Sequence, residues 1–249
     1  MLEAASPAPR TRTPRSTKLA GTRKAAPLKP LKALEDVGGQ RIYHLTHISN
    51  LPGILADGHL LADGSALWEN RPAVDISSGD TRARRRNTPI AGGGSDSIAQ
   101  FVPFFLAPNA NVWEGLRAQT VDPRLAATAR DLAPADFVML VSTVKQAIAV
   151  HDDDEAVAVT DGDAAHVLTR IGSNPEARDR MLRTLRADEE QTEILEAELL
   201  VRESFPVDQV TLLGVANDKV RDQVKKILAG AAHKPKVAVY PPWFQRPEA

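Results

Sequence analysis

Seven short apolar runs of strand length recur along this chain of 249 residues, and their spacing constrains the fold more than any other feature. In chain order they are RIYHL, QFVPFFLAP, DFVMLVST, AVAVTDG, ELLVRES, VTLLGVA and KVAVY. Helical patterns fall between them at irregular intervals: residues 49–58, NVWEGLRAQ, residues 174–193 and NDKVRDQVKKILAG. Several links between strands are too short for parallel crossovers. The sequence therefore predicts an α+β domain with a mixed sheet rather than a doubly wound one.

Residues 62–98 contain too few apolar side chains for packed structure, and they include the polar stretches ARRRNTP and AGGGSDS. A connection of that length in a compact domain is usually functional, so we predict a long functional loop here. The next strand, FVPFF, has a proline at its centre. Because proline lacks the N–H that a strand ladder uses, this pattern predicts an edge strand or a bulged one.

Charge is distributed unevenly along the chain. Residues 1–34 carry eight lysines and arginines against Glu3 alone, about +7, which leaves about −8 on the rest because the whole chain has a net charge of −1. This segment is rich in Pro, Ala, Ser and Thr and cannot bury enough apolar surface to offset its ordering entropy. We predict a disordered basic tail over residues 1–36 and one folded domain over 37–245. The tail is either an arm that attracts nucleic acid or a solubilising extension.

Composition excludes several classes of protein. Without cysteine there are no disulfide scaffolds, thiolate zinc sites or cysteine nucleophiles. No run approaches the roughly 18 to 20 apolar residues of a membrane span, and the N-terminus lacks the apolar core of a secretory signal. We therefore expect a cytoplasmic protein that does not enter a membrane. Signature motifs such as a P-loop, HExxH or GxSxG are missing, which leaves P-loop nucleotide hydrolysis and zinc proteolysis unsupported.

His44 and His47 stand three positions apart on the first predicted strand, which raises the question of a metal site. Positions three apart point to opposite faces of a strand, and this disfavours joint ligation. A metal would also need a third ligand, and the other four histidines show no paired spacing. We therefore predict no metal. One of the two histidines belongs to the core or the surface, and the other is available to line a site.

Two groups of charged residues could bind or act on a substrate. Glu196 and Glu198 occupy alternate positions at the start of a predicted strand, so both carboxylates lie on one predicted face. They are either the solvent face of an edge strand or fixed carboxylates that stabilise a developing positive charge. Arginine also occupies four of the five positions 82–86. Guanidinium groups suit bidentate phosphate recognition, although a solvated basic loop would explain them equally well.

Taken in order, these segments resemble the DarT family, toxins that transfer ADP-ribose from NAD to a base in single-stranded DNA. The family's opening NAD-binding segment is matched by YHLTHISNLPGILADGHLLAD, its VPFxxAPRSPMLY strand by FVPFFLAPNANVW, its central strands by MLVSTV and VTDGDA, and its catalytic-glutamate strand by EAELLVRESFPVDQV. The resemblance covers about residues 41–240. It implies an ADP-ribosyltransferase fold, in which a split mixed sheet with short flanking helices holds NAD, as a substrate, in an extended cleft.

Carried over by position, the resemblance implies that Glu198 is catalytic. Its carboxylate would hold the 2′-hydroxyl of the ribose and stabilise the oxocarbenium-like charge as nicotinamide leaves. Arg85 would reach both NAD and the target base; as a permanently charged guanidinium it would polarise the base rather than act as a general base. His44 would hydrogen-bond the adenosine ribose. The implied NAD-binding set is His44, Leu45, Thr46, Gly53, Leu61 and Arg85.

On the target side, the resemblance implies contacts from Arg82, Arg84, Arg86 and Glu196. Glu196 stands where the family often has glutamine, APNANVWE replaces APRSPMLY, and RADEEQTEILEAE is acidic where the family is basic. Acidic surface weakens binding to a phosphate backbone. We expect single-stranded DNA as the acceptor, with RNA, a protein arginine, or a non-catalytic module that binds NAD or nucleic acid as the alternatives. A macrodomain antitoxin that removes the modification is the expected partner.

Overall fold

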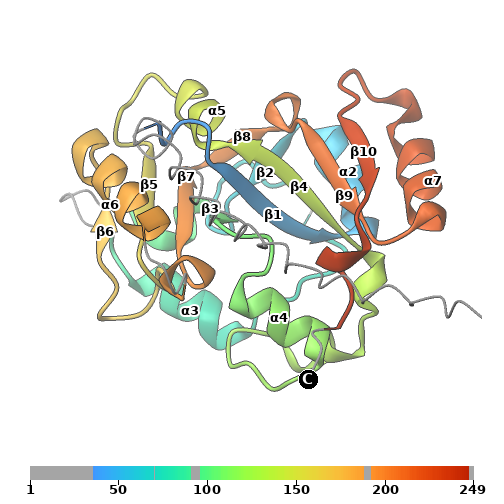
Figure 1. Cartoon of the computed structure of the whole chain (residues 1–249), viewed down its shortest axis with the longest axis horizontal. Coiled ribbons are helices and arrows are strands. Elements are labelled where there is room, and N and C mark those ends of the chain that lie inside the picture. Colours follow the sequence, from blue (N-terminus) through green and yellow to red (C-terminus); the bar gives the residue numbers. More distant parts are fainter. Residues whose placement is uncertain (1–35, 70, 91–95, 188–191, 247–249) are drawn as a thin grey trace, which may run out of the picture. The chain divides into compact units, whose positions relative to one another are not determined.

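A computed structural model of the chain describes residues 36–69, 71–90, 96–187 and 192–246, so the predicted tail lies outside the described residues except for its last position. An eight-stranded mixed sheet forms the centre, in the order β10-β9-β4-β1-β3-β7-β5-β6 (Figure 1). Only β9 and β10 pair in parallel among these strands. The strands are β1 (Arg41–His47), β3 (Phe101–Phe105), β4 (Phe137–Thr143), β5 (Val157–Thr160), β6 (Ile171–Gly172), β7 (Glu198–Arg202), β9 (Leu212–Val215) and β10 (Lys236–Val239). This architecture confirms the predicted mixed α+β fold.

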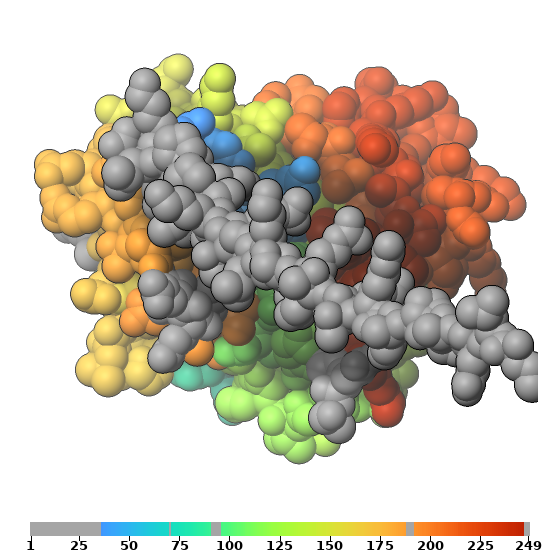
Figure 2. All heavy atoms as spheres, viewed as in Figure 1, coloured from blue at the N-terminus to red at the C-terminus, as the bar shows by residue number. Residues whose placement is uncertain are grey.

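Helices cover both faces of the sheet. The face with the largest apolar core is packed by α2 (Leu51–Asp57), α5 (Val144–Ala149), α6 (Pro175–Ala187) and α7 (Asp218–Ile227). On the other face, α4 (Asn111–Ala118) inserts the fully buried Trp113 between the rings of Phe137 and Phe244. The helices α6 and α7 lie at opposite ends of the sheet (Figure 2). Within the described ranges no helix is both long and apolar enough to cross a membrane.

The sheet is split between β1 and β3. These neighbours pair at one position, Tyr43 with Phe105, whereas β1 pairs with β4 and β3 pairs with β7 along their whole lengths. Pro103 lies in the split, and its carbonyl is 2.9 Å from Nδ1 of His44 on β1. The N and C=O of one strand residue point toward the same neighbour, so the missing N–H of Pro103 faces the gap, where no ladder uses it. The prediction of an edge strand for FVPFF was therefore wrong, because β3 is central and its proline occupies the split.

Residues 62–98 are not one long polar loop, as the composition predicted. They contain α3 (Gly79–Asn87), which begins where Oγ of Ser78 accepts a hydrogen bond from the N–H of Thr81, at 3.2 Å. Asp80 in the first turn and arginines in the last turn also suit the helix dipole. The loop prediction failed because α3 buries only Thr81 and therefore lacks an apolar stripe.

A second, two-stranded sheet joins β2 (His59–Leu61) to β8 (Ser204–Pro206) and closes one end of the split. Glu203, between β7 and β8, has a left-handed backbone with φ 61°, which turns the chain from the main sheet into the small one. Its carbonyl accepts from the N–H of Ala62 at 2.9 Å, and its carboxylate accepts from the hydroxyl of Ser65. The chain that follows β2 is thereby fixed beside the split.

Candidate functional site

A cavity of about 430 Å³ opens at the split and is called the pocket below. Its walls come from β1, α2, β2, β3, α3, Trp68, the segment 71–77 and the start of β7. Most of the site residues implied by the sequence line it: His44, Leu45, Gly53, Leu61, Arg82, Arg85, Glu196 and Glu198. Thr46, Arg84 and Arg86 are not among the lining residues. The structure therefore brings eight of the eleven predicted positions to one cavity.

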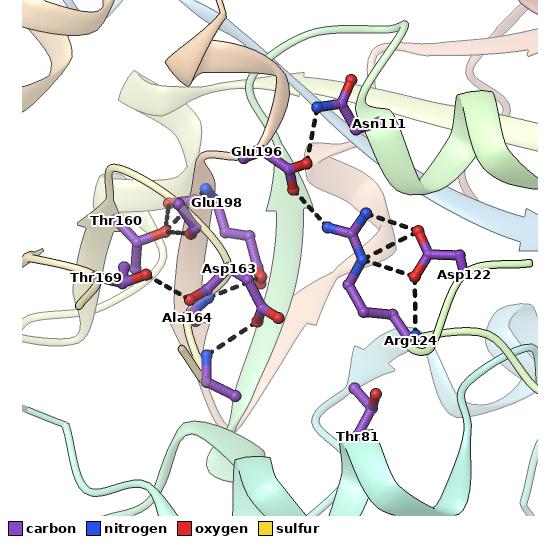
Figure 3. Close-up of polar contacts among 12 residues, drawn as sticks. Thr81, Asn111, Asp122, Arg124, Thr160, Asp163, Ala164, Thr169, Glu196 and Glu198 are labelled. Atoms are coloured by element: carbon purple, nitrogen blue, oxygen red, sulfur yellow. Dashed lines mark hydrogen bonds and ion pairs between the residues drawn. The ribbon is translucent and has the colours of Figure 1, made fainter. Parts of the chain in front are cut away.

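Glu198 is the first residue of β7 and is only 8% exposed. Its N–H donates to Oγ1 of Thr160 at the end of β5, at 3.0 Å, and that hydroxyl donates to the carbonyl of Gly162 at 2.6 Å. The N–H of Ala164 donates to Oε1 of Glu198 at 3.2 Å (Figure 3). The turn TDGDA after β5 therefore holds both the backbone and the carboxylate of Glu198 in place.

Arg85 reaches Glu198 from α3 on the opposite wall. Its Nη1 lies 3.0 Å from Oε2 and 3.2 Å from Oε1 of Glu198, and the arginine side chain is 15% exposed. The other terminal nitrogen, Nη2, is buried and has no hydrogen-bond partner among the residues that the structure describes. Because a buried donor without a partner is costly, this atom suits an acceptor oxygen of a ligand in the pocket.

His44 presents its second ring nitrogen as a hydrogen-bond acceptor. Burial lowers the pKa of His44, and the hydrogen bond to the carbonyl of Pro103 only partly opposes this effect. The ring is therefore neutral at pH 7, and Nδ1 must carry the proton because its partner, 2.9 Å away, is a carbonyl. Nε2 is then left as an acceptor, which suits a ribose hydroxyl. His47, by contrast, packs on Phe137 and accepts from the N–H of Ser49, at the start of the next helical turn.

The wall formed by β1 and α2 depends on Asn50. Asn50 directly precedes α2, but its side chain makes no capping hydrogen bond to that helix. Its Nδ2 instead donates to Oγ1 of Thr46 at 3.1 Å and to the carbonyl of Val74 at 2.8 Å, while its Oδ1 accepts from the N–H of Val74 at 2.9 Å. Thr46, 8% exposed, thus anchors the segment 71–77 through Asn50 and Val74. Gly53 lines the pocket, and a Cβ at that position would meet no atom within 4 Å.

The remaining arginines of α3 have acidic or hydroxyl partners. Arg82 pairs with Asp75 and with Asp63, and Arg86 pairs with Asp63 at 2.9 Å. Arg84 is exposed and donates to Oγ1 of Thr81, at 3.1 Å. Asp63 and Asp75 were not singled out from the sequence, since nothing in their local pattern points to α3. Arg84 is the member of this group without an acidic partner in the described part of the chain.

Glu196 is held by a network that we call the Glu196 cluster, comprising Asn111, Asp122, Arg124 and Glu196. Glu196 lies outside the strand because it caps the C-terminal end of the 3-10 helix Glu193–Leu195. This differs from the prediction that Glu196 and Glu198 both belong to the strand. Nδ2 of Asn111 donates to Oε1 of Glu196 at 2.7 Å, and Nη1 of Arg124 pairs with Oε2 of Glu196 (Figure 3). Arg124 also donates to both carboxylate oxygens of Asp122, through Nε and Nη2, at 2.7 to 3.2 Å.

The electrostatics of the Glu196 cluster favour charged partners. Burial alone would lower the pKa of Arg124, but the hydrogen bonds and charges of Asp122 and Glu196 outweigh burial and raise it. Burial would likewise raise the pKa of Asp122, and its hydrogen bonds with Arg124 lower it instead. Asn111 and Arg124 were missed by sequence reasoning because they lie 85 and 72 positions from Glu196.

Chemically, the pocket combines a fixed carboxylate, a buried guanidinium with an unused donor, a neutral histidine acceptor and apolar walls. A dinucleotide would find partners here for its phosphate and ribose groups, since guanidinium suits oxyanions and a neutral histidine nitrogen suits a hydroxyl. Within the described ranges no three His, Asp or Glu side chains meet in a way that could hold a metal ion. The donor set therefore fits NAD.

Comparison with known proteins agrees with this arrangement. The family model described as "DarT: ssDNA thymidine ADP-ribosyltransferase, DarT" matches residues 43–245. A DNA ADP-ribosyl transferase of Thermus aquaticus is 26% identical over 216 residues, which cover 82% of this chain and 89% of that protein. Thermus sp. 2.9 DarT in complex with ADP-ribosylated ssDNA is similar with a TM-score of 0.67 and 24% identity, over 82% of this chain and 96% of that one. Its complex with NAD+ gives 0.61 and 23%, over 82% and 97%.

Proposed function

Because the chain belongs to the DarT family of single-stranded DNA thymidine ADP-ribosyltransferases, we propose that its pocket binds NAD and delivers ADP-ribose to a thymidine base. The observation that carries the proposal is the pairing of Arg85 with Glu198 inside a cavity of about 430 Å³. The similar Thermus sp. 2.9 protein in complex with NAD+ supports NAD as the donor.

The reaction needs a negative group beside the departing nicotinamide. The bond between C1′ of the ribose and the nicotinamide nitrogen breaks, its electron pair leaves with nicotinamide, and positive charge develops on C1′ and the ring oxygen. Glu198, with Oε1 fixed by the N–H of Ala164, orients the 2′-hydroxyl and offsets that charge. A nitrogen of the base then bonds to C1′ and releases its proton to solvent.

Arg85 acts on the substrate as a permanent cation. Its Nη1 donates to Glu198. Its Nη2, which has no partner among the described residues, is available to an oxygen of the base or of NAD. A guanidinium cannot accept a proton at any pH that the protein survives, so Arg85 polarises the base and does not deprotonate it. Arg85 therefore belongs to both the catalytic and the NAD-binding sets.

The NAD-binding wall is formed by β1, α2 and β2. Nε2 of His44 accepts from a ribose hydroxyl, and Leu45 and Leu61 supply apolar contact at the pocket wall. Gly53 leaves open space where a side chain would otherwise enter the pocket. Thr46 acts indirectly, through its hydrogen bond with Asn50.

Single-stranded DNA approaches along α3 and the Glu196 cluster in this proposal. The exposed Arg84 is available to a phosphate, whereas Arg82 and Arg86 would have to exchange Asp63 for one. Glu196 lies on the acceptor side of the pocket. A macrodomain hydrolase that removes the modification remains the proposed partner, and its co-expression should relieve any growth arrest that this protein causes.

Labelling with NAD tests the proposed function. NAD labelled in its adenylate half is incubated with the protein and, in separate reactions, thymidine-containing single-stranded DNA, RNA and cell protein. We expect label in the DNA alone, and a loss of about 10²-fold to 10³-fold in rate for Glu198→Gln, which keeps the size of the side chain and removes its charge. Glu176→Gln on α6, with its side chain 85% exposed, is the matched control.

Other outcomes would assign a different function. Label in RNA alone or in protein alone would identify a different acceptor and overturn the proposal that DNA is modified. Binding of NAD with no label in any fraction would identify a non-catalytic module. An active Glu198→Gln protein would refute the catalytic assignment of Glu198.

A further inference from the structure

A carboxylate at the acceptor side of the pocket is a difficulty for a protein that binds DNA. Glu196 lines the pocket, and its side chain is 35% exposed. Single-stranded DNA is a polyanion, so a free carboxylate at this point would repel it. Some feature of the structure must offset the charge of Glu196 if the proposed function holds.

Arg124 supplies the opposite charge and is itself held in place. Its Nη1 pairs with Oε2 of Glu196, while Nε and Nη2 both donate to the carboxylate of Asp122 (Figure 3). The N–H of Arg124 also donates to Oδ1 of Asp122, at 2.8 Å. The guanidinium is therefore held from two sides, and each of its three nitrogens contacts an acidic side chain.

Both oxygens of Glu196 are occupied by protein donors. Oε1 accepts from Asn111 at 2.7 Å and Oε2 pairs with Arg124. A guanidinium acceptor would need those same two oxygens for a bidentate contact. An incoming arginine would therefore have to share both oxygens with Asn111 and Arg124, and these two contacts give the carboxylate one fixed orientation at the pocket.

We infer that Arg124 is a positioning residue for the DNA acceptor, which acts by partly offsetting the charge of Glu196 and by fixing its orientation. This inference rests on the proposed function and deepens it, because it assigns the choice of acceptor to the Glu196 cluster. Arg124 does not contact the phosphate backbone in this account. Its effect on DNA should therefore disappear when the charge of Glu196 is removed.

A pair of substitutions tests the inference. Arg124→Met keeps an unbranched side chain in place of the aliphatic part of arginine and removes its charge and donors, while Glu196→Gln keeps the shape of the carboxylate and removes its charge. We expect Arg124→Met to raise the KM for single-stranded DNA about tenfold, because one partner of a half-buried pair is left unpaired. The KM for NAD should change much less. Arg124→Met combined with Glu196→Gln should return the KM for DNA to within about threefold of the wild type.

A salt titration separates positioning from direct contact. A cation that contacts a phosphate contributes about one unit to the slope of log KM against log salt. We expect the double variant to keep the wild-type slope. If the slope falls by about one, or if the double variant stays as impaired as Arg124→Met, Arg124 binds DNA directly and the inference is overturned. An Arg124→Met protein with wild-type KM would also overturn it.

A variant in which the Glu196 cluster carries no charge is the control for an effect on folding. Arg124→Met leaves Asp122 without its partner, so the triple variant Asp122→Asn, Arg124→Met, Glu196→Gln removes all three charges at nearly constant volume. It should match the double variant in KM for DNA if folding is intact, and thermal unfolding checks that condition. Wild-type protein in the same assay separates the two proposals: no labelling of DNA by the wild type would refute the proposed function, whereas normal labelling without the expected rescue would refute only the role of Arg124.

Discussion

Arg85 and Glu198 are 113 positions apart in sequence, yet Nη1 of Arg85 lies 3.0 Å from Oε2 of Glu198. The arginine comes from α3 and the glutamate from the first position of β7, so the pair links the two walls of the pocket. Only one of the two terminal nitrogens is used, and Nη2 is buried with no partner in the described ranges. A single side chain thereby pairs with Glu198 through one nitrogen and keeps a second donor for a ligand in the pocket.

Replacing Arg85 by lysine should abolish most of the activity. Lysine carries one compact charge, and it cannot place two separated donors on Glu198 and on a substrate oxygen at once. We expect Arg85→Lys to lower kcat for DNA transfer about 10²-fold, with little change in thermal unfolding. Arg221→Lys on α7, far from the pocket in the sheet order, is the matched control. Activity within about threefold of the wild type would show that charge alone suffices at position 85.

A large side chain at Gly53 should block NAD without disturbing the fold. A Cβ at Gly53 meets nothing within 4 Å, and the residue lies inside α2, where leucine is a better helix former than glycine. We expect Gly53→Leu to keep or raise the melting temperature while it raises the KM for NAD about tenfold or more. Gly230→Leu adds a side chain at another open position, outside the pocket, and should leave KM unchanged. An unchanged KM for NAD in Gly53→Leu would show that NAD does not bind against this wall of the pocket.

Seven of the eight strands of the central sheet were predictable because each carries its own signal, whereas the two-residue strand β6 was not predicted. The run DFVMLVST became β4, which is buried over six of its seven residues, and the cap Asn217 accepts from the N–H of Val220 as the helix pattern predicted. The helix α3 carries no such signal, since its stability comes from the cap Ser78 and from contacts with distant acids. Hydrophobic periodicity cannot detect a helix that buries one residue.

The residues of the site also fall into two groups, those that could be predicted from the sequence and those that could not. Resemblance placed Glu198, His44 and Arg85 at positions that do line one pocket, because short motifs carry them along β7, β1 and the α3 segment. Asn111 and Arg124 could not be found from the sequence. They contact Glu196 only because α4 and the turn after it fold against the N-terminal end of β7. No local pattern encodes a contact across more than 70 positions.

Stability should fall in mild acid because of His44. Burial lowers its pKa below the ordinary value of 6.5, so as pH falls below about 6.5 the unfolded chain binds a proton that the folded chain does not. Stability is therefore full above that pH and is lost as pH falls toward the lowered pKa. We expect the melting temperature to drop between about pH 7.5 and pH 5.5, and to drop less in His44→Gln. His151→Gln is measured alongside, since burial lowers the pKa of His151 as well. An equal drop in wild type and His44→Gln would exclude His44 as a source.

Gly214 should tolerate no side chain, because the indole of Trp243 lies directly over it. A Cβ at Gly214 would be 2.6 Å from Cζ3 of that ring. The ring cannot easily move aside: it packs edge-on against Tyr43 at 5.7 Å, and the carbonyl of Trp243 accepts from the indole N–H of Trp113 at 2.7 Å. Overpacking of this kind costs about 1–3 kcal/mol, so Gly214→Ala should lower the melting temperature by several degrees. The double variant with Trp243→Leu should recover part of the loss, and Gly230→Ala should be neutral, because nothing lies within 4 Å of its Cβ. A wild-type melting temperature for Gly214→Ala would mean that this ring is not fixed by its contacts.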